Sequence, residues 1–491
     1  MHPISAPRFP CAPLSPETHA LKIAVVGSGI AGLSAAARLH AAHELTVFEA
    51  ASYAGGHACT VDVPDEAIRA TLSEPTARPV ASRASSSRAS SRDPGLTASI
   101  GRSLPTGIVS HAADLGFMVW NHHTYPELKR LFESHHIATE PTSMGFSLSD
   151  RRTGLEYAGE TLDGVFAQRR NLLRPSFVRM LFDIMRFNRH AVRWAAGRHA
   201  NSTLGDLIQQ ERFPREFRDH FLVPMGAAIW SASEHDMLAF PAAFFVRFLH
   251  NHGMLAPPSQ QFRWRVVTGG ARRYVSALSR PFADRIRLSK AVQRVRRLPG
   301  TGVEIVTAGG CERFDAVVLA LHADQALAVL EDPTMLEREA LTAFPYRRNS
   351  AVLHTDHSVL PRSRRAWASW NYHVPAEPGA AVGVTYDLSR LQHLHTCTPL
   401  LLTLNDGGRV APGRVLLRTA FDHPAFTQDS VAMQARHAEV SGRDRVHYCG
   451  AYWRNGFHED GLVSGLAVAE AILTEPKRVS STAANLASAL S

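Results

Sequence analysis

Three glycines and one carboxylate near the start of the chain have the spacing of a nucleotide-binding turn. The glycines are Gly27, Gly29 and Gly32, and the carboxylate is Glu49. Gly27 permits a tight turn, Gly29 lets the backbone approach a pyrophosphate, and Gly32 lets a helix pack closely on a strand. A carboxylate about 20 residues beyond such glycines can accept hydrogen bonds from a ribose diol. The pattern therefore predicts that the chain binds a dinucleotide.

The elements that must position these residues follow in the order that a βαβ unit requires. Residues 23–26 are an apolar run suited to a buried parallel strand, residues 33–39 read as an alanine-rich helix, and residues 45–48 suit a second strand. The helix N-terminus would offer free N–H groups and the positive end of its dipole to the phosphates. A glycine motif alone is weak, but here strand, turn, helix, strand and acid agree.

Length, charge and cysteine content restrict the class of protein. The 491 residues are too many for one core, so we expect two domains. A net charge of +9 suits nucleic acid, an anionic membrane or an acidic substrate, but no nucleic-acid-binding pattern accompanies it, so we expect no nucleic-acid partner. The five scattered cysteines fit a reducing compartment and exclude a disulfide framework or a structural zinc site. Residues 1–20 resemble neither a signal peptide nor a membrane span, so we expect a cytoplasmic protein, peripheral at the inner membrane surface at most.

The pattern along the chain predicts a discontinuous nucleotide-binding domain interleaved with an α+β substrate domain. The nucleotide-binding parts are expected at residues 21–64, 265–345 and 441–475, and the substrate domain at the mainly helical residues 111–264 and the β-rich residues 346–440. Disorder is expected at residues 1–20, in a Ser/Arg-rich insertion at residues 65–110, and at residues 476–491.

Residues 161–197 predict helices with one apolar stripe. The stripe comprises Met180, Ile184, Phe187, Ala191 and Trp194, and arginines lie on or near the opposite side. Such a stripe is typical of a core-facing helix with a solvated basic face, which is the interpretation that we favour. A helix lying on a membrane surface is the alternative.

Three features favour FAD over a nicotinamide dinucleotide. Gly55 and Gly56 follow Glu49 closely and would admit the second phosphate. Residues 285–320 form a small β unit that could enclose the adenine. A loop at residues 450–462 precedes a helix at residues 463–473, whose N-terminus would face the flavin pyrimidine. A Rossmann-type NAD dehydrogenase leaves the glycine pair and this loop unexplained.

Five further motifs are residues 116–121 (GFMVWN), 264–270 (WRVVTGG), 367–372 (WASWNY), 385–392 (TYDLSRLQ) and 456–461 (GFHEDG). Through these motifs the chain resembles the flavin-containing amine oxidase superfamily, and more narrowly a clade of NAD/FAD-binding oxidoreductases associated with cyclopropane-fatty-acid synthase. The resemblance implies an α/β fold of the amine-oxidase and glutathione-reductase type, with a Rossmann-like FAD-binding domain. It also implies non-covalent FAD, since no cysteine is placed for the covalent link of some relatives.

The resemblance assigns cofactor contacts by position. The residues that would hold the pyrophosphate are Gly27, Gly29, Ile30, Ala31 and Gly32. Those that would contact the ribose, the second phosphate, the adenine and the flavin are Glu49, Gly55, Gly56, His57, Val292, Gly450, His458, Glu459 and Leu462. The superfamily usually has an arginine where His57 stands and an acid where Ala451 stands, which weakens those individual contacts.

Candidates for the chemistry lie in the C-terminal loop. Phe457 occupies the place where amine oxidases have one wall of an aromatic cage, and Tyr452 and Trp453 would line the same cavity or plug a domain interface. His458 is a candidate acid or base, because histidine can titrate near neutral pH. Glu459 is also a candidate for fixing the loop. The side chains of three consecutive residues, His458, Glu459 and Asp460, cannot easily coordinate one ion, so we expect no metal.

These patterns predict an FAD-dependent oxidoreductase that transfers a hydride from its substrate to flavin N5. An apolar, aromatic and basic middle region, together with the resemblance, favours a fatty-acyl or other lipid substrate that is desaturated or isomerised. The alternatives are a true amine oxidase or dehydrogenase, and a flavin-binding accessory protein without turnover. The partner suggested by the resemblance is a methyltransferase of the cyclopropane-fatty-acid-synthase type.

Overall fold

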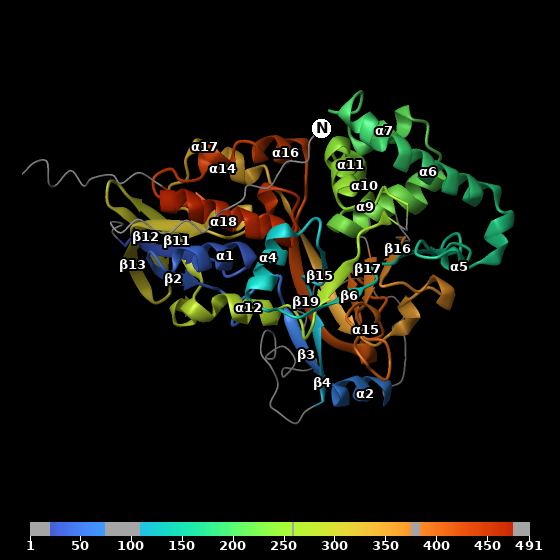
Figure 1. Cartoon of the computed structure of the whole chain (residues 1–491), viewed down its shortest axis with the longest axis horizontal. Coiled ribbons are helices and arrows are strands. Elements are labelled where there is room, and N and C mark those ends of the chain that lie inside the picture. Colours follow the sequence, from blue (N-terminus) through green and yellow to red (C-terminus); the bar gives the residue numbers. More distant parts are fainter. Residues whose placement is uncertain (1–19, 74–108, 258–259, 375–382, 475–491) are drawn as a thin grey trace, which may run out of the picture.

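A five-stranded parallel sheet forms the centre of the nucleotide-binding part in the computed structural model, which describes residues 20–73, 109–257, 260–374 and 383–474 (Figure 1). Its strands, in spatial order, are β10 (Ile286–Arg287), β2 (Glu44–Phe48), β1 (Lys22–Val26), β14 (Ala316–Leu319) and β20 (Val446–Tyr448). Ile23 and Val25 pack into one hydrophobic cluster and Ala24 and Val26 into another, so both faces of β1 are covered. That double burial explains the continuous apolar run, and the predicted fold class is confirmed.

Two different layers cover the faces of this sheet. One face carries the helices α1 (Ile30–Leu39), α12 (Arg272–Ser279) and α18 (His458–Thr474). The opposite face carries the meander β11 (Val292–Leu298), β12 (Gly302–Thr307) and β13 (Gly310–Phe314), with α13 (Ala323–Val329) and α14 (Met335–Thr342). Helix α18 begins at His458, five residues before the expected start, because the Asp460 carboxylate accepts a hydrogen bond from Phe457 N (3.0 Å) and caps the polar first turn.

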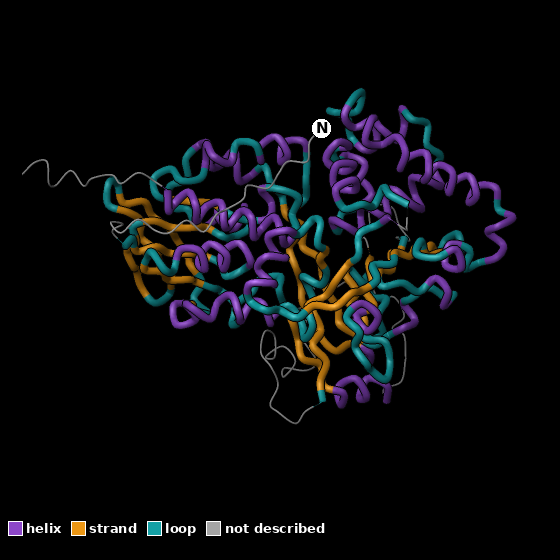
Figure 2. Tube along the Cα trace, viewed as in Figure 1, coloured by secondary structure: helices purple, strands orange, loops and turns teal. Residues whose placement is uncertain are grey.

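A seven-stranded mixed sheet forms the substrate domain and is a separate group of strands from the parallel sheet (Figure 2). Its spatial order is β19 (Val415–Pro424), β15 (Tyr346–His354), β18 (Leu401–Leu404), β17 (Gly383–Asp387), β16 (Trp370–His373), β7 (Phe146–Asp150) and β8 (Leu155–Ala158). Only the β16–β7 pair is parallel. The sequence pattern predicted a β-rich region at residues 346–440 but did not locate β19, which borders the site described below.

Helices cover one side of this sheet and confirm the helical prediction for residues 161–197. They are α5 (Leu162–Val165), α6 (Pro175–Ala196), α7 (Leu204–Gln210), α8 (Arg215–Phe217), a π-helical turn (Arg218–Leu222), α9 (Val223–Trp230), α10 (Glu234–Ala239) and α11 (Ala242–Asn251). Met180, Phe187 and Trp194 of α6 are buried in the same cluster as residues of α9 and α11. The stripe therefore faces the core, as the favoured interpretation holds.

Short elements connect the two large sheets. They are β3 (Thr60–Pro64) with β4 (Ser110–Asp114), β5 (Trp120–Asn121) with β9 (Trp264–Val267) and β6 (Thr139–Thr142), and the helices α2 (Asp65–Ser73), α4 (Pro126–Ser134), α15 (Leu388–Leu391), α16 (Gln428–Gln434) and α17 (His437–Val440).

The expected insertion at residues 65–110 differs from the structure at both ends. Residues 65–73 form α2, because Ile68 is buried among Val61, Val63 and Ala113, and Thr71 Oγ1 is hydrogen-bonded to Thr355 Oγ1 at 2.6 Å. Ser110 begins β4. Residues 74–108 of the insertion lie outside the described residues, as do residues 1–19 and 475–491 of the two expected tails.

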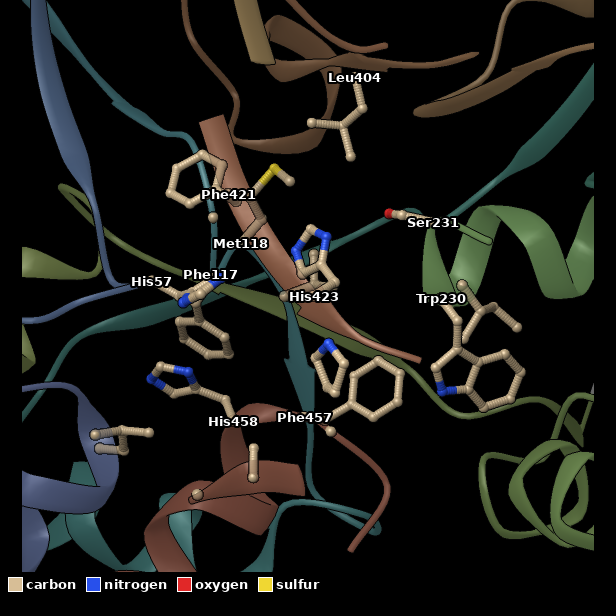
Figure 3. Close-up of a pocket in the computed structure, with 18 of the residues that line it drawn as sticks. His57, Phe117, Met118, Trp230, Ser231, Leu404, Phe421, His423, Phe457 and His458 are labelled. Carbon is tan, nitrogen blue, oxygen red and sulfur yellow. The ribbon is translucent and has the colours of Figure 1, made fainter. Parts of the chain in front are cut away.

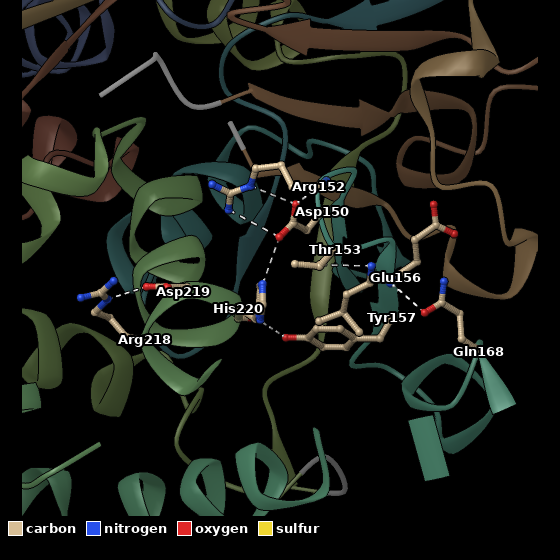
Figure 4. Close-up of polar contacts among 10 residues, drawn as sticks. Asp150, Arg152, Thr153, Glu156, Tyr157, Gln168, Arg218, Asp219 and His220 are labelled. Atoms are coloured by element: carbon tan, nitrogen blue, oxygen red, sulfur yellow. Dashed lines mark hydrogen bonds and ion pairs between the residues drawn. The ribbon is translucent and has the colours of Figure 1, made fainter. Parts of the chain in front are cut away.

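A buried carboxylate joins the π-helical turn to the β7–β8 hairpin (Figure 4). Asp150 is fully buried and accepts hydrogen bonds from Arg152 N (2.9 Å) and Arg152 Nε (3.2 Å), and its second oxygen lies 3.1 Å from His220 Nε2. Tyr157 Oη donates to the His220 carbonyl at 2.6 Å. Burial opposes ionisation of Asp150, but the bonds from Arg152 and His220 outweigh it and lower its pKa to about 2.

Replacing Asp150 with asparagine is expected to lower the free energy of unfolding at neutral pH by about 2 kcal/mol, because a neutral amide then replaces the buried charged acceptor of Arg152 and His220. The native carboxylate contributes stability above its unfolded pKa, about 4, and loses that contribution as the pH falls through its folded pKa of about 2. The difference between wild type and variant should therefore shrink over this range in urea unfolding. Asp163→Asn is the matched control, because Asp163 and its partner Arg169 are both more than half exposed. Equal losses in both variants would contradict the assignment.

Candidate active site

The β1–α1 turn forms a cradle with no side chain in its way. Gly27 has φ +99°, and a Cβ there would lie 2.4 Å from Ala320 O. A Cβ on Gly32 would lie 2.0 Å from Gly27 O, whereas a Cβ on Gly29 meets nothing within 4 Å. Gly29 is the N-cap of α1 and provides no side-chain hydrogen bond to the first N–H groups, those of Ile30 and Ala31 included. The helix start is therefore open to an anion.

Glu49 lies at the end of β2 and is fixed beside this turn. Its Oε2 accepts hydrogen bonds from Ser28 N (2.9 Å) and Ser28 Oγ (2.6 Å), and its Oε1 accepts one from Ala51 N (2.8 Å). A carboxylate has about four acceptor positions, so one stays available for a ribose hydroxyl. The start of β11 adjoins this acid, because Lys290 N donates to Glu49 O at 2.8 Å, and Val292 lines the same cavity.

The glycine pair after Glu49 touches the first turn. Gly55 N donates to Ser28 O at 2.9 Å, and a Cβ on Gly56 would lie 3.1 Å from Gly29 Cα. Both glycines have positive φ, +125° and +57°. The pair therefore lets this segment lie close to the backbone of the β1–α1 turn. His57 follows immediately in the sequence.

His57 belongs to a group of three half-buried imidazoles that line the cavity, and Figure 3 shows two of them, His57 and His423. Its ring centroid lies 5.5 Å from that of His423 on β19 and 6.0 Å from that of His322, which follows β14. Burial lowers the pKa of all three, that of His423 to about 4. His57 Nε2 has no hydrogen-bond partner among the described residues. The group presents a polar but uncharged wall to the cavity.

Neighbouring residues at the start of α18 have different roles. The His458 ring stacks on Phe117 (centroids 3.9 Å apart, planes at 14°) and is hydrogen-bonded through Nε2 to Tyr274 Oη. Burial lowers the pKa of His458 to about 3, so the imidazole is neutral at neutral pH. Phe457 stacks on Phe248 at 4.8 Å and forms part of the cavity wall.

The remaining predicted residues fall on both sides of the cavity wall. Gly450 and Tyr452 line the cavity, and Gly450 N donates to Ser464 Oγ at 3.0 Å. Trp453 and Leu462 are buried in the clusters behind the wall. The Glu459 carboxylate accepts hydrogen bonds from Glu127 N (2.8 Å) and Leu128 N (2.9 Å), so it caps α4. This placement favours the role of fixing the loop over contact with a cofactor.

One continuous cavity of about 1900 Å³ connects the cradle to the substrate domain. Pockets for single small ligands usually measure about 300–1,000 Å³, so this cavity has room for a dinucleotide and a second molecule. Its far end is lined by side chains that were not among the predicted site residues, although Trp370 and Tyr386 belong to two of the motifs. They are mainly apolar and include Leu181, Phe221, Met225, Ile229, Trp230, Phe248, Met254, Trp370, Tyr386 and Phe426. The aromatic-rich residues 240–248 and the carboxyl end of β14 were the available signals for Phe248 and His322.

Two kinds of site are absent from the part of the chain that the structure describes. No group of three or more histidine, cysteine, aspartate or glutamate side chains there could hold a metal ion. No helix within residues 20–73, 109–257, 260–374 and 383–474 is long and apolar enough to cross a membrane.

The glycine cradle, the acid after β2 and the cavity that leads into a second domain define a dinucleotide-binding oxidoreductase. Residues 101–362 match the profile of the flavin containing amine oxidoreductase family, and residues 25–74 match that of an NAD(P)-binding Rossmann-like domain. The chain belongs to the flavin containing amine oxidoreductase family and is an FAD-dependent oxidoreductase. The cradle fits FAD, because a Cβ at Gly27, Gly32 or Gly56 would crowd the chain and the start of α1 is open.

Solved structures of the same fold differ widely in sequence from this chain. Cyclohexylamine oxidase from Brevibacterium oxydans has a TM-score of 0.60 at 14% identity, over 93% of this chain and 99% of that one. Putrescine oxidase bound to putrescine has a TM-score of 0.59 at 13% identity, over 94% and 100%. A CLA-producing fatty acid isomerase from P. acnes has a TM-score of 0.58 at 14% identity, over 92% and 98%. No curated protein sequence matches the chain.

Proposed function

We propose that this FAD-dependent oxidoreductase acts on a fatty-acyl or other lipid chain and introduces or moves a double bond. The observation that carries the proposal is the apolar lining of the far end of the cavity. Three charged side chains reach the wall there, Glu160, Arg189 and Arg263, and all three are exposed. An apolar chain can therefore lie along the interior with its polar head near the surface, since burying an unpaired charge would be costly.

Residues of one helical run form the track for such a chain. Phe221, Met225 and Ile229 all line the cavity, four residues apart, and Trp230 and Phe457 stand at the end nearer the cradle. At 1.5 Å per residue the run from Phe221 to Ile229 is about 12 Å long. These side chains would hold a C–H bond over the flavin and exclude water.

When bound, FAD supplies a two-electron acceptor for the hydride. In a desaturation the neighbouring carbon loses a proton to a base or to water, the double bond forms between the two carbons, and dioxygen or another oxidant removes the two electrons afterwards. In an isomerisation the hydride returns to a different carbon. The fatty acid isomerase of the same fold supports this substrate class.

Amine oxidation is the second candidate function. The family description and the two amine oxidases of the same fold favour it, and Asp422 on β19 offers a carboxylate in the cavity wall beside His423. An ammonium group could pair with Asp422, so Asp422→Asn should abolish amine turnover if this function holds.

Anaerobic mixing separates the two functions. We expect fatty acids or acyl lipids in detergent to bleach the flavin absorbance, and common amines to leave it unchanged. If the chemistry is an isomerisation, the flavin returns to its oxidised spectrum and the product has a shifted double bond by mass spectrometry. Bleaching by amines together with inert lipids would establish the amine oxidase instead. A flavin that neither class changes, with no lipid product, would favour the accessory protein.

A further inference from the structure

A cluster of apolar side chains is exposed on the substrate domain, far along the chain from the nucleotide cradle. Leu172, Leu173, Pro175, Val178, Arg179 and Phe182 surround one shallow surface hollow, formed by the 3₁₀ turn Arg169–Leu173 and the start of α6. Leu173 is 89% exposed and Phe182 62%. Large apolar side chains exposed next to one another are uncommon on a soluble protein and mark an interaction site.

The outward face of α6 continues this cluster and is basic as well as apolar. Arg179, Phe182, Met185, Arg189 and Val192 are all exposed and recur every three or four residues, so they share one side of the helix. Residues 162–196 hold seven arginines and two acidic residues. One of those acids, Asp183, pairs with Arg179 and Arg186 and is buried. We name the exposed side chains of Leu172, Leu173, Phe182, Met185 and Val192, with Arg179 and Arg189, the α6 face.

The α6 face is continuous with the opening of the cavity. Met185 is 56% exposed and also lines the cavity, together with Arg189 and, on the inner side of the same helix, Leu181 and Ile184. The α6 face and the cavity wall therefore share Met185 and Arg189. This continuity links the exposed apolar cluster to the substrate end of the site.

We propose that the α6 face docks on the surface of an anionic lipid bilayer and draws the acyl substrate from it, which rests on the proposed function. Leucine, phenylalanine and methionine would enter the headgroup boundary, and the arginines would pair with lipid phosphates. A second copy of the chain fits less well, since a symmetric contact would bring two arginine-rich faces together.

Vesicle binding tests the docking without any turnover. The FAD-loaded protein is mixed with vesicles of phosphatidylcholine alone and with vesicles of phosphatidylcholine and phosphatidylglycerol in equal parts, and the bound fraction is measured by sedimentation. We expect binding to the anionic vesicles at least about tenfold tighter, and weakened by added salt.

The matched variants place a glutamate on different surfaces. Leu173→Glu combined with Phe182→Glu should reduce binding to anionic vesicles at least about tenfold, since two apolar contacts are lost and two like charges are added. Met335→Glu is the control, because Met335 is an 83% exposed apolar residue on α14, outside the α6 face. Flavin content and turnover of detergent-dispersed substrate should stay unchanged in both proteins.

Three results would overturn the docking proposal: no preference for anionic vesicles, equal binding by the double variant and wild type, or a self-association that only the double variant abolishes. The last result would assign the α6 face to a dimer. Anionic-vesicle binding with a flavin that acyl lipids never reduce would instead contradict the proposed function and leave the docking intact. Turnover of dispersed acyl chains without vesicle binding would contradict the docking alone.

Discussion

The Gly29→Val variant is expected to fold and to contain no FAD. Its backbone lies at φ −66° and ψ 178°, which valine adopts readily, and a Cβ at this position meets no atom of the chain within 4 Å. Gly29 lines the cavity at the start of α1, so this empty space is where a pyrophosphate would approach. We expect FAD affinity to fall at least about 100-fold, equivalent to about 3 kcal/mol. The ratio of flavin to protein absorbance after purification measures the FAD content.

Gly32→Ala separates cofactor loss from loss of the fold. A Cβ on Gly32 would lie 2.0 Å from the Gly27 carbonyl oxygen, so this variant should destabilise the protein itself. Melting temperatures of the FAD-free proteins should therefore be near wild type for Gly29→Val and clearly lower for Gly32→Ala. Stoichiometric FAD in purified Gly29→Val would show that the diphosphate does not approach this turn.

The Met225→Trp variant is expected to block long acyl chains at the middle of the cavity. Met225 lies between Phe221 and Ile229 on the cavity wall, so a larger ring there would displace a chain that has to pass it. A displacement of about 1 Å at the reacting carbon can cost about 100-fold in rate. We expect kcat/KM for long-chain substrates to fall by about that factor, and that for short-chain substrates to fall much less. Anaerobic flavin reduction in a stopped-flow instrument measures both rates.

Met185→Trp provides a control with the same change of side chain. Met185 lines the cavity too, but it is 56% exposed at the opening, where a larger ring can turn outward. Flavin content and reduction by dithionite should match wild type in both variants. Equal losses for short and long chains in Met225→Trp would mean that the substrate does not extend along this helical run.

The parts of the site that could be predicted are those that one short segment encodes. The order of strand, glycines, helix and acid over residues 22–49 is local, and the structure forms it with Glu49 beside Ser28. The arginine-rich helix was predicted for the same reason, since its stripe repeats within α6. Structure that depends on residues close together in the sequence produces a pattern that can be recognised there.

The parts that could not be predicted depend on distant segments. Glu459 stands one residue after His458, yet its carboxylate binds backbone N–H groups 331 and 332 residues earlier in the chain. Buried and partly exposed residues do not alternate regularly along strand β19. The sequence therefore lacks the two-residue period that would have predicted this strand and its place beside His57. The suggested methyltransferase partner and the cytoplasmic location stay predictions from the sequence.

The strand order of the parallel sheet has a consequence for how the protein is made. β1 pairs with β14, whose first residue is Ala316, and β14 pairs with β20, which ends at Tyr448. Gly461, in the first turn of α18, would carry a Cβ 2.8 Å from Ile30 Cγ2, so α18 closes over the start of α1. A nascent chain on the ribosome therefore cannot complete its cofactor cradle until nearly all of the chain has emerged. Until then the apolar residues of β1 and α1 need protection by other segments or by a chaperone.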